Sequence, residues 1–304
     1  MPNIYFLLFE LIIYIQLVLC LRHAWKQGTA HLLRLLAGIL FGVMLELATI
    51  RQLHAYEYGR FLIMVLDVPL CIGVAWGCIL YSVMEFSDGS SLPYWTRPIL
   101  DALLALNIDL ALDAVAIRFG FWDWGQGLTF QYFGVPYGNF WAWFWVIFFF
   151  SLGHRLFAHR TDWIGKWLSP IPALVIGLMG VLATNALITF VIPWAYTGLT
   201  VSILLIAALV LMIALRPTFY ITAIPSLVFW VPFLMHIYVL MAGLISGLIF
   251  NPPVLLLIGL SMIAVAFYLH WRTIQNIFAS LGLLKPPLNG NATQSSAASH
   301  RDCR

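Results

Sequence analysis

Long apolar runs and short polar segments alternate along the whole chain. About 20 consecutive apolar residues are needed for an α-helix to cross the hydrocarbon core of a membrane. Nine such runs lie near residues 3–21, 32–50, 61–83, 98–119, 139–157, 169–192, 198–215, 219–248 and 254–271. The pattern predicts an all-α polytopic membrane protein with eight or nine transmembrane helices. The eighth run is long and contains Pro225 and Pro232, so we expect a kinked or tilted helix there.

The two ends of the chain differ in character. The first run follows Met1-Pro2-Asn3, which has no basic residue, and no small-residue cleavage site follows it. We therefore expect a retained helix rather than a signal peptide. Residues 285–304 contain Asn-Gly, Ser-Ser and Ala-Ala pairs, which predicts a disordered cytoplasmic tail after a helical transmembrane domain over residues 1–284.

The composition excludes a soluble domain. Hydrophobic residues make up 62% of the 304 residues and charged residues only 9%, whereas soluble domains contain about 25% charged residues. The 13 tryptophans exceed what interfacial belts need, so we expect some rings to line an interior pocket. The four cysteines show no metal-ligand spacing, and three of them lie in apolar runs as small buried residues.

Lysine and arginine are unevenly distributed. With an external N-terminus and nine alternating helices, 12 of the 15 fall in cytoplasmic segments, and Arg51, Arg60 and Arg118 remain outside. The positive-inside rule therefore predicts an external N-terminus and a cytoplasmic C-terminus. His154 and His159 are predicted in a basic cytoplasmic loop. The net charge of +3 follows from this orientation and does not indicate nucleic-acid binding.

Two aspartates lie one helical turn apart in the fourth run. One ionisable side chain at the bilayer centre costs about 2.5 to 3.5 kcal/mol, so Asp109 and Asp113 together cost roughly 5 to 7 kcal/mol. This cost is comparable to the net stability of a domain and suggests a function. The two side chains lie about 40° apart on one helix face. We therefore expect both to face one aqueous or protein-lined cavity.

Three further carboxyl groups are predicted in the same half of the bilayer. Glu10, Glu46 and Asp67 lie toward the outer ends of the first three runs. With Asp109 and Asp113 they make five acids from four helices, whereas random placement would scatter acids over both halves. A shared polar cavity near the outer surface is the simplest interpretation.

The partners of these acids are expected to come from other segments. Arg118 lies about 140° from Asp113 around the helix, so the two cannot pair. Asn107 points away from Asp109, which predicts a hydrogen bond to a neighbouring helix. The outer connections offer as candidate partners Arg51, His54, Glu57, Arg60, Asp123 and Asn139.

A segment rich in glycine and aromatic residues, residues 119–144, follows the aspartate helix. Glycine and proline permit tight turns here, so the chain is expected to fold back. Trp122 and Trp124 flank Asp123. Such rings lie either at the headgroup level or in a cavity wall, and their place directly after the two aspartates favours the wall. Asn139 either caps the fifth helix or faces the acids.

A series of short motifs lies between residues 40 and 150. They are Glu46, Tyr56-Glu57-Tyr58-Gly59, Asp67-Val68-Pro69-Leu70 with Ala75-Trp76, the Asp109 and Asp113 helix, Phe121-Trp122-Asp123-Trp124, and Gly134-Val135-Pro136 with Asn139-Phe140. In this order they resemble the bacterial and archaeal carotenoid hydratases of the bisanhydrobacterioruberin hydratase type. Those membrane proteins add water to the terminal double bond of an acyclic carotenoid. The resemblance implies an enzyme of a prokaryotic cytoplasmic membrane that takes a lipophilic polyene from the bilayer, among membrane lipids, without cofactor or metal ion.

The chemistry implied by the resemblance suits the residues. Hydrating a trisubstituted alkene requires an acid that is protonated at neutral pH and a group that orients water. Burial and a like-charged neighbour favour a proton on one carboxyl of a pair, so Asp109, Asp113 and Glu46 are expected to share these catalytic roles. Aromatic faces stabilise a cation by about 1 to 2 kcal/mol each. The residues expected to bind substrate are Tyr58, Asp67, Trp76, Trp122, Asp123, Trp124, Tyr137 and Asn139.

Two other functions remain compatible with the buried acids. An intramembrane prenyltransferase would hold magnesium and a diphosphate on aspartates, and Asp109 with Asp113 forms half of such a site. The fifth to ninth runs contain no acid to complete it. A proton-coupled transporter of a small or lipidic solute would spread its acids across the bilayer, and the last four runs offer little beyond Asn185 and His236.

Overall fold

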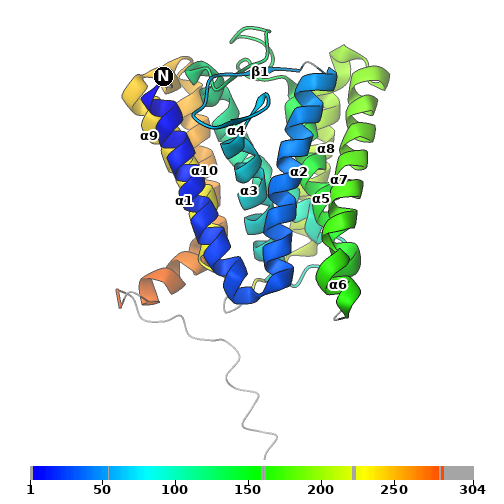
Figure 1. Ribbon diagram of the computed structural model, residues 1–304. Helices are drawn as coiled ribbons and strands as arrows, with labels where there is room; N and C mark the ends of the chain where they lie inside the picture. Colours follow the sequence, from blue (N-terminus) through cyan, green and yellow to red (C-terminus); the bar gives the residue numbers. More distant parts are fainter. Residues whose placement is uncertain are drawn as a thin grey trace, which may run out of the picture.

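The computed structural model describes residues 3–53, 55–158, 160, 162–220, 224–280 and 282–283. Within them the chain forms a bundle of α-helices (Figure 1). The predicted all-α class is confirmed, and the predictions on His54, His159 and residues 285–304 lie outside the described residues. The helices are α1 (Ile4–Gln27), α2 (Thr29–Leu53), α3 (Leu70–Asp88), α4 (Arg97–Ala116), α5 (Tyr137–Ala158), α6 (Trp163–Leu168), α7 (Pro170–Ala186), α8 (Thr197–Leu215), α9 (Leu227–Ser246) and α10 (Val254–Ser280).

Helix α4 is the most polar of the long helices and is enclosed by others. In the described part of the chain eight helices are long and apolar enough to cross a membrane, and α4 is not one of them. It carries Asp101, Asp109 and Asp113, yet nearly all its side chains are buried. Helices α3, α5, α8, α9 and α10 contact it. The predicted number of eight or nine membrane-crossing helices is confirmed by these eight, although the fourth predicted run, which forms α4, is not among them.

Short strands and loops cover the end of the bundle that carries the start of α1, called here the upper end (Figure 1). Strand β1 (Glu57–Tyr58) pairs antiparallel with β4 (Trp122–Asp123). Strand β2 (Met64–Val65) pairs antiparallel with β3 (Val68–Pro69). The β1–β4 ladder joins the segment after α2 to the segment after α4, so it brings together two parts of the chain that are distant in sequence.

Two predicted helix starts are wrong. The third run begins at residue 61, but α3 begins only at Leu70, because residues 64–69 form the β2–β3 hairpin with Leu66 at a φ of 57°. The eighth run begins at residue 219, but α9 begins only at Leu227. Pro225 precedes α9, and a residue before proline is disfavoured in the α conformation.

Glycines set the close spacing between α2 and α3. A Cβ atom at Gly42 would lie 2.5 Å from Cβ of Trp76 and 3.0 Å from the carbonyl oxygen of Gly73. Gly77 leaves equally little room on the same interface. Small residues let helix backbones approach closely. Here they place Trp76 of α3 beside Glu46 of α2.

A cluster of paired charged side chains lies in the lower half of the bundle. Asp88 at the end of α3 lies 3.1 Å from Arg34 and 3.2 Å from Arg97, and it also pairs with Arg155. Arg155 reaches Asp101 as well, at 3.1 Å. The five acids singled out from the sequence are not part of this cluster, and Glu46 and Asp113 line a cavity at the other, upper end. Acids therefore occur in both halves of the bundle. Crowding of the acids no longer argues against a transporter.

The prediction of a basic loop around His154 is also wrong. Helix α5 continues to Ala158, so His154 and Arg155 are buried inside the bundle. Neither ring nitrogen of His154 has a hydrogen-bond partner among the described residues. The charge of Arg155 is tolerated inside the apolar bundle because Arg155 pairs with the acids Asp88 and Asp101.

Asn107 joins three helices, as its direction on α4 predicted. Its amide nitrogen donates to the carbonyl oxygen of Met262 on α10 at 3.1 Å. Its Oδ1 lies 3.0 Å from Nε2 of His236 on α9. The predicted hydrogen bond to a neighbouring helix is confirmed.

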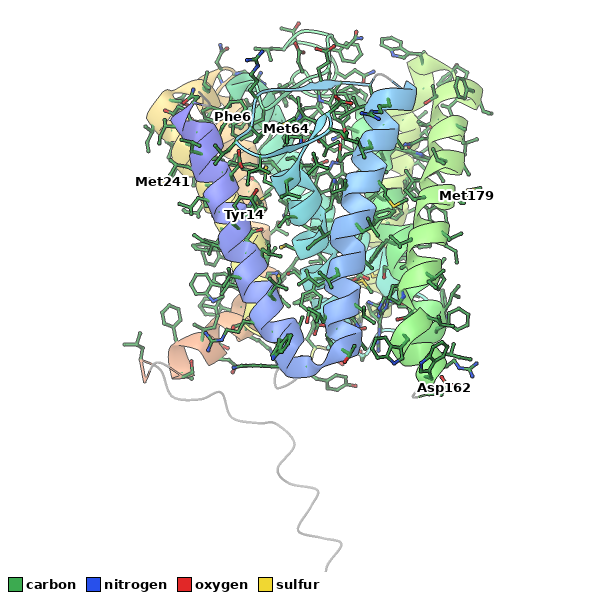
Figure 2. The ribbon with its side chains drawn as sticks, viewed as in Figure 1. Phe6, Tyr14, Met64, Asp162, Met179 and Met241 are labelled. Atoms are coloured by element: carbon green, nitrogen blue, oxygen red, sulfur yellow. The ribbon has the colours of Figure 1, made fainter. Side chains whose placement is uncertain are left out.

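The outer faces of the bundle are apolar. Met179 on α7 and Met241 on α9 point outward and are 63% and 47% exposed (Figure 2). Such faces match lipid tails, which are as apolar as leucine. The polar side chains of α4 are therefore separated from the lipid by the surrounding helices.

Candidate active site

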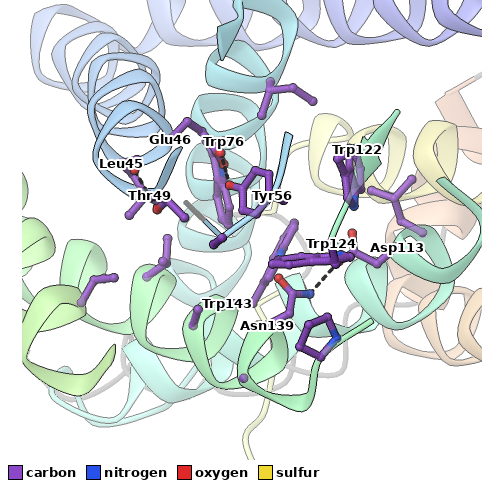
Figure 3. A pocket seen from close by; sticks show the side chains of 18 of the residues that line it. Leu45, Glu46, Thr49, Tyr56, Trp76, Asp113, Trp122, Trp124, Asn139 and Trp143 are labelled. Carbon is purple, nitrogen blue, oxygen red and sulfur yellow. Dashed lines mark hydrogen bonds between the residues drawn. The ribbon is translucent and has the colours of Figure 1, made fainter. Parts of the chain in front are cut away.

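A cavity of about 320 Å³ lies near the upper end of the bundle (Figure 3). Its walls come from α1, α2, α3, α4, α5, α7 and α9 and from the segments around β1 and β4. The surface is mostly apolar, and a few polar side chains converge on it, which is typical of sites for small apolar ligands. The polar and aromatic lining residues are Phe9, Glu46, Thr49, Tyr56, Tyr58, Trp76, Asp113, Trp122, Trp124, Asn139, Trp143, Asn185 and Thr189.

Glu46 forms one polar centre in the cavity wall. Trp76 Nε1 donates to Oε1 of Glu46 at 2.7 Å, and the Tyr58 hydroxyl donates to Oε2 at 2.7 Å. The Tyr56 hydroxyl donates to the same oxygen. Burial, and then the nearby Glu46 charge, raises the pKa of Tyr56 and of Tyr58 well above the ordinary value. Both tyrosines therefore remain neutral donors to the Glu46 carboxyl.

Asp109 and Asp113 form the second polar centre. Both are almost fully buried, and Nδ2 of Asn139 donates to Oδ2 of Asp113 at 2.6 Å and to Oδ2 of Asp109 at 3.2 Å. Asp113 lines the cavity, but Asp109, one turn earlier on α4, does not. The expectation that both acids face the cavity is therefore wrong for Asp109. Asp109 Oδ1 has no partner in the part of the chain that the structure describes. One amide thus serves two neighbouring carboxyl groups.

No basic side chain pairs with these three acids. Across the described residues, the ion pairs involve other carboxyl groups, and none includes Glu46, Asp109 or Asp113. Without a cation, two adjacent carboxyl groups cannot both ionise at low cost. The arrangement therefore favours a shared proton on the aspartate pair.

Aromatic rings form much of the remaining wall. The ring centroids of Trp76 and Trp143 lie 4.3 Å apart, and those of Tyr56 and Trp124 lie 4.7 Å apart. The Nε1 atom of Trp124 is buried and has no partner within the described residues. Aromatic faces attract positive charge, so this wall is suited to a cationic group in the cavity.

The β1–β4 ladder explains which residues of the aromatic segment reach the cavity. Tyr58 lies opposite Trp122, and Glu57 lies opposite Asp123. Side chains alternate between the two faces of a strand. Tyr58 and Trp122 therefore line the cavity, whereas Glu57 and Asp123 are exposed.

Three residues predicted to bind substrate lie outside the cavity wall. Asp67 is in the β2–β3 turn, 55% exposed, and pairs with Arg51 at 2.8 Å. Asp123 accepts from the backbone nitrogen of Gly125 at 2.8 Å. The ring of Tyr137 packs against Gly198 of α8. Their positions do not support direct contact with a ligand in this cavity.

Glu10 and Arg118 form hydrogen bonds with the backbone of loops and do not line the cavity. Glu10 accepts from the backbone nitrogen of Leu62. Arg118 does not pair with Asp113, as its position on the helix predicted. It donates to the carbonyl oxygens of Phe133 at 2.9 Å and Asn251 at 2.6 Å, and so fastens the loop above α4.

The cavity is also lined by residues that were not predicted for the site, and Asn185 was considered only for the transporter alternative. Asn185 of α7, with Ile188 and Thr189 of the following turn, completes the wall. The signal available in the sequence was one amide in an otherwise apolar run. Polar residues within membrane segments are functional candidates by default, but nothing local shows that α7 faces α4 across the cavity.

Comparison with known families identifies a relationship over most of the chain. The family described as carotenoid biosynthesis protein matches residues 3–217. This range includes α1 to α8 and every residue of the cavity wall except Met235. No curated protein and no solved structure matches the chain.

Proposed function

The chain belongs to the carotenoid biosynthesis protein family, and from this premise we propose that it adds water to the terminal double bond of an acyclic carotenoid. The observation that carries the proposal is the Asp109–Asp113 pair, bridged by Asn139 and opening through Asp113 into an apolar, aromatic cavity. An acid of this kind, in a site that admits a hydrocarbon, is what alkene protonation requires. A lipophilic carotenoid dissolves in the bilayer, where an integral membrane bundle can meet it.

The proposed reaction begins with proton transfer to carbon. The Asp113 carboxyl donates its proton to the less substituted carbon of the terminal double bond. The π electrons form the new C–H bond, and a tertiary carbocation remains. Water then attacks this cation to form the C–O bond, and the oxonium returns one proton to Asp113. The net change is the addition of one water molecule.

The proposed mechanism gives the three acids different roles. Asp113 is the proton donor, because it alone of the pair lines the cavity. Asp109 and Asn139 are positioning residues that hold the proton on the pair. Glu46, which accepts from three donors, provides negative charge for the developing cation, since donors to a carboxylate favour its ionised form. The indole faces of Trp76, Trp122 and Trp124 supply the remaining stabilisation.

The test is expression in membranes that accumulate an acyclic carotenoid, with mass analysis of the pigments. We expect a product heavier by one water molecule. Asp113→Asn should abolish its formation, and Asp109→Asn should lower it strongly. Asp67→Asn is the matched control, because Asp67 is an exposed aspartate outside the cavity.

Other outcomes would point elsewhere. Unchanged pigments with several acyclic carotenoids would contradict the hydratase proposal. A magnesium-dependent product from a prenyl diphosphate would indicate the prenyltransferase alternative. Proton-dependent solute uptake with no change in the pigment would indicate the transporter alternative.

A further inference from the structure

Helix α7 changes its geometry where it meets the cavity. It is α-helical from Pro170 to Ala186 and continues as a π-helix over Leu187–Val191. Single π-turns within α-helices are rare and occur frequently at functional sites. Asn185, near the end of the α-helical part, and Ile188 and Thr189 of the π-turn line the cavity. The irregular turn therefore belongs to the same cavity as Asp113.

The side-chain oxygen of Asn185 lacks a hydrogen bond, whereas the oxygens of the neighbouring Thr184 are hydrogen-bonded. The Thr184 hydroxyl donates to the carbonyl oxygen of Gly180 at 2.8 Å, and the Thr184 carbonyl accepts from Trp141 Nε1 at 2.9 Å. By contrast, Asn185 Oδ1 is buried and has no hydrogen-bond partner among the described residues. A buried unpaired carbonyl oxygen is unfavourable and calls for an explanation.

We propose that Asn185 positions the water molecule that attacks the carbocation, an inference that rests on the proposed hydratase function. Water donates one hydrogen bond to Asn185 Oδ1, which leaves an oxygen lone pair free to attack the cation. A carboxamide oxygen accepts hydrogen bonds but is not a base at neutral pH. The proton released when the C–O bond forms therefore goes to the Asp113 carboxylate, which gave up the first proton.

In this proposal Asp113 protonates the double bond, and Asn185 positions the water that captures the resulting cation. The cation formed by protonation has two fates. Attack by water gives the alcohol, whereas loss of a proton returns an alkene, either the original one or its double-bond isomer. A group that holds water therefore sets the ratio of alcohol to alkene without affecting the protonation step.

The experiment follows both fates in deuterium oxide. Membranes carrying the protein are incubated with an acyclic carotenoid. Mass spectrometry measures the hydrated product, and deuterium in the recovered unhydrated polyene reports protonation without capture by water. For Asn185→Ala we expect the ratio of hydrated product to deuterated polyene to fall on the order of tenfold, the effect of about one lost hydrogen bond. Asn185→Ser, which retains an acceptor oxygen, should recover part of this ratio.

Control variants distinguish this role from a structural one. Leu182→Ala removes an exposed side chain on the same helix and should leave the ratio unchanged. The ratio is measured within one sample, so it does not depend on how much protein folds. If Asn185→Ala fails to accumulate, Asn185→Ser against Asn185→Val gives the same comparison. An unaltered ratio in the folded variants, including a proportional loss of both products, overturns the assignment.

Failure of the underlying function gives a different result. If the unmodified protein produces neither hydrated product nor deuterated polyene, the hydratase proposal itself is wrong. If it produces both, and the Asn185 variants leave the ratio unchanged, the hydratase proposal stands and the water-positioning role alone is wrong.

Discussion

Asn139 Nδ2 lies 2.6 Å from Oδ2 of Asp113, and this contact ties the first turn of α5 to the last turns of α4. The same nitrogen reaches Asp109 at 3.2 Å. Because no basic side chain of the described chain pairs with either acid, Asn139 is the polar group that fixes their geometry. Asp113, the candidate acid, is thus held in place by Asn139, which lies beyond the loop that connects α4 to α5.

Asn139→Ala should slow hydration strongly. A hydrogen bond to a charged group contributes about 1.5 to 3 kcal/mol, so we expect a rate loss of about 10- to 100-fold. The measurement is the initial rate of alcohol formation per folded protein. Asn107→Ala removes another interhelical amide on α4, away from the cavity, and should lower stability but not this rate. Equal rates in both variants would show that Asn139 has no special role.

Gly42→Ala should disturb the Glu46 centre through Trp76. The added Cβ would lie 2.5 Å from Trp76 Cβ, so the indole must move away from the Glu46 carboxyl. Overpacking of this kind costs about 1 to 3 kcal/mol of stability, and hydration should slow as the indole is displaced. Gly259→Ala is the control, because its Cβ would meet nothing closer than 3.8 Å. Thermal unfolding and the hydration rate should both be unaffected by the control substitution or slightly improved.

Arg155→Met should destabilise the bundle without acting on the cavity. It leaves Asp88 and Asp101 without a shared buried partner, and removing one member of a buried pair costs about 3 to 5 kcal/mol. We expect a large fall in the thermal midpoint in detergent, partly reversed by adding Asp101→Asn. Arg160→Met breaks an exposed pair with Asp162 and should leave the midpoint unchanged. Comparable losses in the two variants would contradict a buried network.

The tyrosines beside Glu46 should stay neutral at alkaline pH. Burial raises the pKa of Tyr56 and Tyr58 above the ordinary value of about 10. For a pKa raised on folding, the stabilisation is fully present below the unfolded value and is lost as pH rises through the folded value. We therefore expect that tyrosine ionisation does not lower the rate of carotenoid hydration up to about pH 10.

Ultraviolet titration checks this directly. The tyrosinate absorbance of the protein, minus that of the Tyr56→Phe and Tyr58→Phe double variant, should show no titration near the ordinary tyrosine pKa. A difference spectrum that titrates there would mean that both hydroxyls are open to water and that the cavity is not closed around Glu46.

Local periodicity was enough to predict several features. The apolar runs predicted the helical membrane bundle, because run length and hydrophobicity are properties of the chain itself. The spacing of Asp109 and Asp113 predicted a common face, and the amide that both share agrees with it. The direction of Asn107 was predictable in the same way, since a helix fixes the angle between residues near in sequence.

Contacts between distant segments depended on the tertiary structure. The rotation of each helix against its neighbours decided that Asn185 lines the cavity and that Arg155 is buried with Asp101. The β1–β4 register decided that Trp122 faces inward and Asp123 outward. The sequence by itself determined the helices and the faces of their side chains. Only the packing of the helices decided which faces meet. The free energy of a contact between two helices depends on the side chains of both, so neither segment alone predicts it.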